Sequence, residues 1–234
     1  MGATQFKLLY ICNGNNARSP LAAACTSDLL SGTSQNGGLR WDIGSAGTHA
    51  VNGDPVRPDA VRAAHDLNLD ISNHQPSLLT ADQCADPDLI LAMSWEQVSH
   101  IWSLVPQAWD RVFTIKEFVH WAQRAPVRPP ILFPDRLAEM RDKIIQAHAI
   151  RKRARADYGF WGGIRPQDLN LIEPNGKGEE AWTALAKAVH ALVSDVIMLL
   201  RGPEHQEAQP IARSVSKKHT PRARRSTARA KARR

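Results

Sequence analysis

The sequence predicts an α/β fold, a doubly wound sheet of four parallel strands that is flanked by helices and carries a phosphate-binding loop after its first strand. Three observations support this prediction. Short apolar runs alternate along the chain with longer runs of helical periodicity, as in consecutive strand–helix–strand units. The 234 residues are enough for one hydrophobic core with an insertion or a tail. A loop rich in glycine and asparagine joins the first apolar run to an alanine-rich one.

The first strand is predicted at residues 6–11, and the first helix opens at residues 21–24 and runs to about Leu30. Residues 12–20 between them form a strand-to-helix turn, in which Pro20 suits the first helical position. A turn of this kind gathers unpaired N–H groups at the positive end of a helix. It is therefore a ready site for an oxyanion.

The same loop carries a thiol and a guanidinium group. The field of the helix favours the thiolate form of Cys12, because thiols near helix N-termini and cations ionise readily. Arg18 offers a planar fork that can hold two oxygens of one phosphate. Cys12 and Arg18 are therefore predicted to be catalytic, as the nucleophile and the cation that serve a bound phosphoryl group. The residues expected to bind the phosphate are Asn13, Gly14, Asn15, Asn16, Ala17, Arg18 and Ser19.

The later elements continue the alternation of strands and helices. Further strands are expected at residues 41–46, 88–93 and 111–115. Helices are expected at residues 59–67, 94–104, 116–123, 135–156 and 179–201. A polar turn at 34–38 separates the first helix from the second strand. Because ligands bind beyond the carboxyl ends of parallel strands, the loops that follow the first two strands are expected to meet.

We interpret the chain as one domain over residues 1–202 with an insertion at about 124–168. Several prolines break the chain at the start of this insertion, and a charged amphipathic helix follows that ends in a basic run, as suits a helix C-terminus. A loop rich in glycine and aromatic residues comes next, at 158–163. The insertion could cover the mouth of the site, form a partner surface or add a packing layer.

The basic charge of the chain is concentrated at its C-terminus. The net charge is +7, yet residues 211–234 hold ten Lys or Arg and no Asp or Glu, so the other 210 residues carry 20 basic and 23 acidic side chains. Residues 203–234 lack apolar periodicity, which predicts a disordered tail. Residues 211–234 could bind nucleic acid or another acidic partner through contacts that salt weakens, or remain solvated without a partner.

Composition argues against several classes of protein. Three cysteines in a chain of this length do not indicate a disulfide framework, and the histidines match no zinc spacing, so we expect neither a metal nor a cofactor. The apolar run at 188–200 is too short and too polar to span a bilayer. No charged leader with a cleavage site precedes residues 6–11, which indicates a cytoplasmic protein.

The loop, with its string C-x-G-N-x-x-R-S-P, resembles the signature of the low-molecular-weight protein tyrosine phosphatase family, C-x5-R-[ST] near the N-terminus. The S-A-G-T at residues 45–48 and the stretch at 69–74 are similar to further features of that family. The resemblance implies the same four-stranded fold, a thiophosphate intermediate on Cys12 and a supporting hydrogen bond from Ser45 to the loop at Asn15.

The family supplies a general acid from an aspartate in a late D-P motif, and here Glu173-Pro174 occupies the matching place. By this resemblance Glu173 is the expected acid, with Asp168 as the alternative. A glutamate is one methylene longer, and misplacement of an acid by about 1 Å can cost roughly 100-fold in rate. Asn175 and Gly176 stand where the family often has tyrosines, and Ala17 stands where some members have a second loop cysteine.

The leading hypothesis is a cysteine-dependent phosphatase that hydrolyses phosphate monoesters, with a phosphorylated protein, through its phosphotyrosine, or a small phosphate ester as substrate. One alternative is an arsenate reductase of the same fold, in which Cys12 attacks arsenate. Thioredoxin-coupled versions need two further cysteines near the site, a pattern that Cys25 and Cys84 do not match. A second alternative is an oxyanion-binding module whose tail binds nucleic acid.

Overall fold

The computed structural model describes residues 5–31 and 39–202 and confirms the predicted fold class. The four strands form one parallel sheet in the order β2-β1-β3-β4. Their bounds are β1 Gln5–Cys12, β2 Arg40–Gly47, β3 Leu89–Ala92 and β4 Val112–Thr114. The predicted turn at 34–38 and the predicted tail at 203–234 lie outside the described residues.

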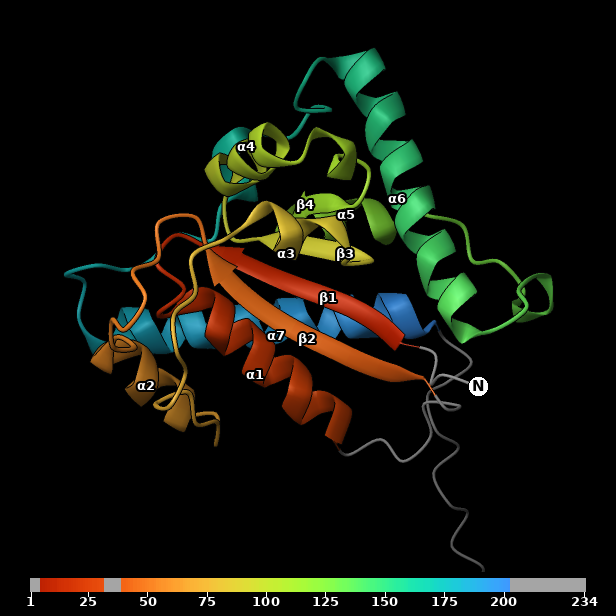
Figure 1. Cartoon of the computed structure of the whole chain (residues 1–234). Helices are drawn as coiled ribbons and strands as arrows, with labels where there is room; N and C mark the ends of the chain where they lie inside the picture. Colours follow the sequence, from red (N-terminus) through yellow and green to blue (C-terminus); the bar gives the residue numbers. More distant parts are fainter. Residues whose placement is uncertain (1–4, 32–38, 203–234) are drawn as a thin grey trace, which may run out of the picture.

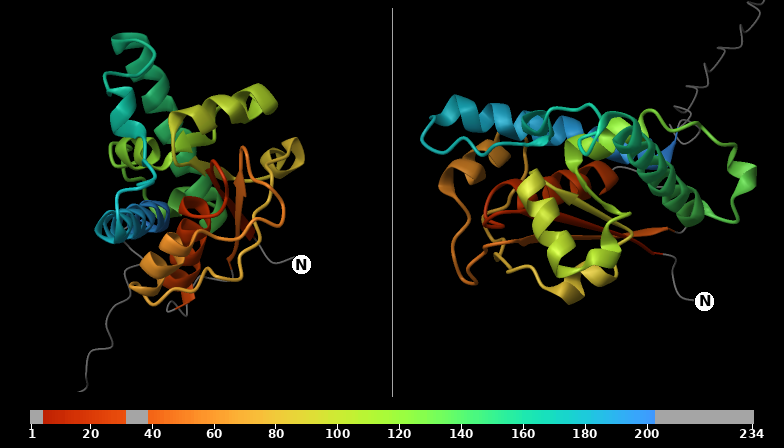
Figure 2. Two further views of the ribbon diagram at one scale, coloured as in Figure 1. Left: turned by 90° about the vertical axis from the view of Figure 1, so that its left-hand side faces the viewer. Right: turned by 90° about the horizontal axis from the view of Figure 1, so that it is seen from above.

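The helices cover both faces of the sheet (Figures 1 and 2). Their bounds are α1 Arg18–Ser31, α2 Pro58–His65, α3 Ala81–Ala85, α4 Trp95–Leu104, α5 Ile115–Ala122, α6 Arg136–Tyr158 and α7 Glu179–Arg201. Three short 3₁₀ turns lie at Pro106–Ala108, Pro130–Leu132 and Pro166–Leu169. All helices except α3 were expected; a five-residue helix is too short to show helical periodicity, although its capping box at Thr80 and Gln83 is a sequence signal for it.

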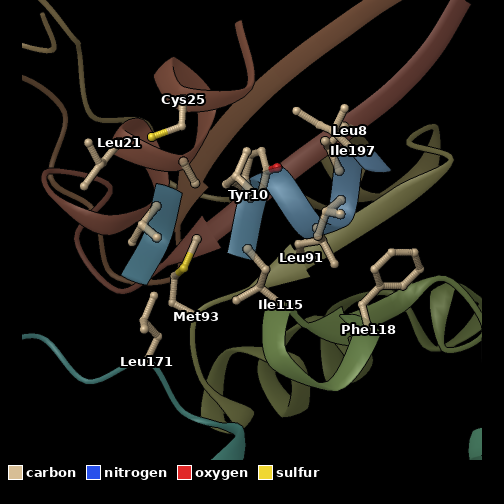
Figure 3. Close-up of a cluster of buried hydrophobic side chains, with 14 of the residues drawn as sticks. Leu8, Tyr10, Leu21, Cys25, Leu91, Met93, Ile115, Phe118, Leu171 and Ile197 are labelled. Atoms are coloured by element: carbon tan, nitrogen blue, oxygen red, sulfur yellow. The ribbon is translucent and has the colours of Figure 1, made fainter. Parts of the chain in front are cut away.

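Strand β1 lies at the centre of the sheet, with parallel neighbours on both sides. Its side chains alternate between two hydrophobic clusters, because successive residues of a strand point to opposite faces. Leu8 and Tyr10 join the larger cluster with α1, α5 and α7 (Figure 3). Leu9 and Ile11 join the smaller one with α3 and α4. Burial on both faces explains the nearly continuous apolar run of this strand.

Helix α7 supplies a long stripe to the larger cluster. Its buried residues are Trp182, Leu185, Ala186, Val189, Val193, Val196, Ile197 and Leu200. Among the helices that the structure describes, α7 alone has the length and apolar composition that a membrane span requires. Its apolar stripe packs on the core of the sheet, and α1, α2 and α5 lie against it.

Helix α6, in the middle of the predicted insertion, packs beside α5 and α7. Leu137, Met140 and Ile144 form its buried stripe, as its amphipathic pattern predicted, whereas Ile145 is 65% exposed. The predicted end at Ala156 extends by two residues, to Tyr158. Helix α6 therefore packs as an additional layer beside α5 and α7.

The basic run near the C-terminal end of α6 includes one buried arginine and one that is mostly buried. Arg151 is 1% exposed, and its guanidinium donates to the carbonyl oxygens of Val112 at 2.7 Å and Trp109 at 2.6 Å. The carboxylate of Glu117 on α5 pairs with Arg151 at 3.4 Å and with Arg155 at 3.1 Å. Sequence periodicity could not show this, because the partners of Arg151 come from other segments. These contacts of Arg151 anchor α6 to the start of β4.

Candidate active site

Cys12 is the last residue of β1 and Arg18 the first of α1, so the loop lies at the carboxyl edge of the sheet beside the end of β2 (Figure 1). Asn15 adopts a left-handed backbone conformation with φ of 50°, which asparagine tolerates better than most residues. This curl points its N–H toward Cys12 Sγ, at 3.2 Å. The hydroxyl of Ser19 donates to the same sulfur at 3.0 Å. Two donors, one from the backbone and one from a side chain, therefore face the Cys12 sulfur.

The side chain of Asn15 connects the loop to its surroundings. It is fully buried, and its Nδ2 donates to Ser19 Oγ and Ser45 Oγ, both at 2.9 Å. Its Oδ1 accepts from the N–H of Ser77 at 2.9 Å and lies 3.0 Å from His74 Nε2. Since an amide oxygen only accepts, His74 carries its proton on Nε2. Burial lowers the pKa of His74, which keeps its ring neutral near pH 7.

Ser45, singled out in the sequence, thus lies within hydrogen-bond distance of Asn15. Sequence reasoning missed His74 and Ser77 as contacts of the loop. The stretch at 69–74 was similar to a family feature, but its local sequence does not show which way His74 points. The bridge between Gly47 and Leu78, which carries residues 74–77 beneath the loop, is a tertiary feature.

The backbone at the end of β2 packs directly against the backbone of the loop. The N–H groups of Thr48 and His49 donate to the carbonyl oxygens of Cys12 and Asn13, at 3.0 and 2.9 Å. A Cβ on Gly47 would lie 2.6 Å from Asn13 O and 2.7 Å from Asn15 N, which no side chain could accommodate. The glycine of S-A-G-T is therefore required by the approach of two backbones.

Arg18 has one side-chain donor without a protein partner. Its side chain is 8% exposed, Nη1 donates to the carbonyl oxygen of Leu171 at 3.0 Å, and Nη2 lies 3.0 Å from Glu173 Oε2. The buried Nε of Arg18 has no hydrogen-bond partner among residues 5–31 and 39–202. Nε and one hydrogen of Nη2 lie along one edge of the guanidinium plane, a geometry that matches two oxygens of an oxyanion.

The structure brings Glu173 to the loop from 155 positions along the chain after Arg18. Its side chain is 13% exposed and lies between two arginines, 3.0 Å from Arg18 and 3.5 Å from Arg57. The alternative acid, Asp168, instead pairs with the exposed side chain of Arg165, at 2.7 Å. Of the two carboxylates that the sequence offered, Glu173 is the one in contact with Arg18.

The segment that carries Glu173 is held by backbone and side-chain hydrogen bonds. Leu171 donates its N–H to Met93 O, just beyond β3, at 2.7 Å, and Figure 3 shows the two side chains close together. Asn170 accepts from the N–H of Trp95 at 2.9 Å through its side chain and from Lys116 Nζ at 2.7 Å through its carbonyl. The acid segment is therefore fixed to the same edge of the sheet as the loop.

Arg57 is the second arginine that contacts Glu173. Its N–H donates to Asn16 O at 2.9 Å, and its guanidinium lies over the ring of Trp182, 5.2 Å from the centroid. A guanidinium over an indole face is favourable by about 0.5–1 kcal/mol at such a site. Arg57 therefore connects the loop, the acid segment and helix α7.

The aromatic loop of the insertion packs at the same end of the sheet. Phe160 and Trp161 make edge-to-face contacts with Trp95, at ring-centroid distances of 5.4 and 4.7 Å. Arg155 lies over the rings of Trp95, Trp102 and Phe160 at 4.9 to 5.4 Å. Phe160 and Trp161 thus contact Trp95, whose N–H donates to Asn170. In the described part of the chain, residues 124–168 supply no charged group to Arg18.

The other two cysteines lie in different surroundings. Cys25 and Cys84 are fully buried, and burial raises the pKa of the first to about 12 and of the second to about 11. Both are free thiols. Across residues 5–31 and 39–202, no cluster of three His, Cys, Asp or Glu side chains could hold a metal ion.

Residues 7–149 match the family model described as low molecular weight phosphotyrosine protein phosphatase. The chain belongs to this family. The family match ends before Glu173, so it says nothing of the acid. A probable low molecular weight protein-tyrosine-phosphatase, EpsP, of Ralstonia nicotianae is 32% identical over 147 residues, which are 63% of this chain and 96% of that protein.

Proteins that are named for other activities are also similar to this chain. A protein-arginine-phosphatase of Bacillus subtilis is 34% identical over 112 residues, 48% of this chain and 71% of that protein. An arsenate reductase of Staphylococcus haemolyticus is 33% identical over 88 residues, 37% of this chain and 57% of that protein. The crystal structure of the low molecular weight tyrosine phosphatase of T. tengcongensis aligns with a TM-score of 0.56 over 82% of this chain and 97% of that one, at 23% identity, which shows the common fold.

Proposed function

We propose that this protein is a cysteine-dependent phosphatase that hydrolyses phosphate monoesters, with protein phosphotyrosine as the leading substrate. One observation carries the proposal: the buried edge of Arg18 has an unpartnered Nε beside the Cys12 loop, with a carboxylate 3.0 Å from the same guanidinium. An oxyanion site, a nucleophile and an acid therefore meet at one edge of the sheet.

In the first step the Cys12 thiolate attacks phosphorus in line, and the bond from phosphorus to the ester oxygen breaks. The phosphate is held by the N–H groups of residues 13–19 and by the free edge of Arg18. Glu173 gives a proton to the departing oxygen, so the alcohol leaves neutral. The product on the enzyme is a thiophosphate on Cys12.

In the second step Glu173, now ionised, takes a proton from water. The resulting hydroxyl oxygen attacks phosphorus, and the bond from phosphorus to Cys12 Sγ breaks. Inorganic phosphate leaves and the thiolate returns. Ser45, His74 and Ser77 act through Asn15, because they hold the side chain whose backbone N–H faces the sulfur.

The protein-arginine-phosphatase relative makes phosphoarginine a second candidate substrate, and the arsenate reductase relatives make arsenate a third. Arsenate reduction through a relay of three protein cysteines is disfavoured, because Cys25 and Cys84 are fully buried and burial raises the pKa of each thiol. Reduction that uses Cys12 and a free small thiol retains a suitable site. A non-enzymatic oxyanion-binding module would use the same Arg18 edge without turnover.

For the rest of the chain we propose one domain over residues 1–202, with the insertion at about 124–168, in a cytoplasmic protein. Residues 211–234 contain ten basic side chains and no acidic one. We propose that this stretch contacts nucleic acid or another acidic partner. This role predicts that the protein binds DNA more tightly as the salt concentration falls. Deletion of residues 211–234 should abolish that binding.

A side-by-side turnover assay tests the proposed activity. Wild type and Cys12→Ser are compared on a phosphotyrosine peptide, a phosphoarginine peptide, p-nitrophenyl phosphate, and arsenate with a small thiol. We expect fastest turnover of the phosphotyrosine peptide and none by Cys12→Ser. Equal phosphate release by Cys12→Ser would refute the nucleophile, and thiol oxidation that depends on arsenate without phosphate release would establish the reductase.

A further inference from the structure

A second pocket lies far from Cys12, beside the last turn of α7. It encloses about 480 Å³ between the segment that follows α5, helix α6 and the end of α7. Figure 1 shows this end of α7 on the opposite side of the molecule from the tip of β1, where Cys12 lies. Residues that line it include Val127, Phe133, Lys143, Gln146, Met198 and Gly202. A pocket of this size can hold a short peptide segment or a small molecule.

Two polar groups in the pocket wall lack partners of their own. Gln146 is 7% exposed, and its Nε2 donates to Asp142 Oδ2, while its Oε1 has no donor among the described residues. Lys143 is half-buried and forms no ion pair in that part of the chain, because the two carboxylates that also line the pocket, Asp142 and Glu139, pair with Arg128 and Arg136. A buried amide oxygen without a donor is costly, which points to an occupant that brings an N–H group and an anion.

Apolar side chains around the same pocket are also left uncovered. Val127 is 71% exposed and Met198 is 50% exposed, and both line the pocket. Apolar residues gathered at the rim of a pocket are typical of a surface that another segment covers.

The chain leaves the body at the rim of this pocket. Arg136, in the first turn of α6, donates to the carbonyl oxygen of Arg201 and thereby caps the end of α7. Gly202 turns the chain with φ of 69°, its N–H donates to Met198 O at 3.0 Å, and it forms part of the pocket wall. The position from which residues 203–234 continue is therefore fixed beside Lys143 and Gln146.

The residues that follow Gly202 have the chemistry that this pocket lacks. Glu204 and Glu207 are the only acidic residues of 203–234, and both come within five residues of the exit. Ile211 and Val215 are the only large aliphatic residues of that stretch. Backbone N–H groups of the same segment would supply a donor for Gln146.

We propose that residues 203–212 bind in this pocket, with Glu204 or Glu207 against Lys143, a backbone N–H on Gln146 and Ile211 on the apolar rim. A tethered segment needs little intrinsic affinity, because a linker of a few residues gives it a millimolar effective concentration. The bound segment directs the basic residues 213–234 away from the end that carries Cys12. The segment is thus a docked anchor for the basic tail rather than a cover for the catalytic loop.

Hydrogen exchange in the full-length chain tests this. Amides of the segment 123–129, in the pocket wall, are followed by mass spectrometry in wild type, Ile211→Asp and the matched Val215→Asp. Docking predicts that Ile211→Asp speeds their exchange by about tenfold, the ratio expected when a bound segment is about 90% occupied, while Val215→Asp leaves it unchanged. Turnover of p-nitrophenyl phosphate by both variants reports that the body is intact.

Charge reversal gives an independent test in the same full chain. Lys143→Glu should speed the exchange of segment 123–129, and the added pair Glu204→Lys and Glu207→Lys should restore its protection. Exchange that is equal in wild type and Ile211→Asp overturns the proposal, as does failure of the reversed pair to restore protection. An equal loss with Val215→Asp assigns the pocket to the basic segment instead. Protection that increases with protein concentration assigns it to a second copy of the chain.

Discussion

The loop at Cys12 and the segment at Glu173 meet at one edge of the sheet, yet they are built in different ways. The loop is local: the sulfur, its two donors and the guanidinium lie within residues 12–19. Glu173 is placed from a distance, by contacts of residues 170–173 with Met93 after β3, with the start of α4, with Lys116 and with two arginines. Local pattern is enough to specify the loop, whereas a carboxylate that meets it depends on the rest of the fold.

The difference predicts unequal tolerance to change. A substitution in the loop removes a group whose place the neighbouring backbone dictates, so no nearby residue can substitute for it. A substitution near Glu173 alters one of several restraints on a segment, so its effect should be graded. Four substitutions, in decreasing order of expected effect, test this contrast.

Arg18→Lys should lower kcat/KM for p-nitrophenyl phosphate by roughly 100- to 1,000-fold, because the single nitrogen of an ammonium lacks the planar fork that holds two phosphate oxygens while another nitrogen binds Leu171 O. Steady-state kinetics measures this. Arg62→Lys, on the outer face of α2 where Arg62 pairs with Asp59, is the matched control and should remain at wild-type rate. A drop below tenfold for Arg18→Lys contradicts a bidentate role.

Glu173→Gln should slow turnover of phenyl phosphate by about 100-fold, because a poor leaving group needs a proton. The effect should be smaller for p-nitrophenyl phosphate, whose leaving group is stable as an anion, and the pH profile should lose the limb that requires a protonated acid. Asp168→Asn is the comparison, since Asp168 pairs with Arg165 rather than Arg18. If Asp168→Asn gives the larger loss, the acid has been assigned to the wrong carboxylate.

Arg57→Ala should lower kcat about two- to fivefold, the rate equivalent of an ion pair worth ~0.5–1 kcal/mol, while inhibition by inorganic phosphate stays unchanged. The reason is that Arg57 contacts the acid but lies outside the loop. Arg57→Lys should recover part of the loss. An increase in the phosphate inhibition constant as large as the fall in kcat would place Arg57 in phosphate binding instead.

The smallest effect concerns acid stability. Burial lowers the folded-state pKa of His74 below its ordinary value of 6.5. The unfolded chain therefore binds this proton more readily, and the stability from neutral His74 is complete above pH 6.5 and declines as pH falls toward the folded pKa. Thermal unfolding between pH 7 and 5 should show a smaller loss of Tm in His74→Gln than in wild type. An equal loss in both proteins means that another group is responsible.

Much of the fold could be predicted from the sequence, because β1, β3 and β4 are buried on both faces and have nearly continuous apolar runs. The edge strand β2 is partly exposed and more polar. The loop could be predicted as an anion site because Cys12, Arg18 and the glycine and asparagines act through a turn that these residues form themselves. The contacts of His74 and Ser77 with Asn15 could not be predicted, because these residues lie 59 and 62 positions further along the chain and reach the loop only in the folded protein. The burial of Arg151 was likewise hidden, because its partners lie on β4 and α5.

The sequence by itself determined that this chain has one parallel sheet and a loop with Cys12 and Arg18 after its first strand. It also offered two carboxylates, Glu173 and Asp168, as candidates for the proposed acid. Only the tertiary structure decided which of them contacts Arg18, by placing Glu173 between Arg18 and Arg57 and leaving Asp168 with Arg165. The physical reason is range: backbone N–H groups and a helix dipole act within one turn of the chain, whereas a carboxylate reaches its arginine only after strands, helices and insertion have packed.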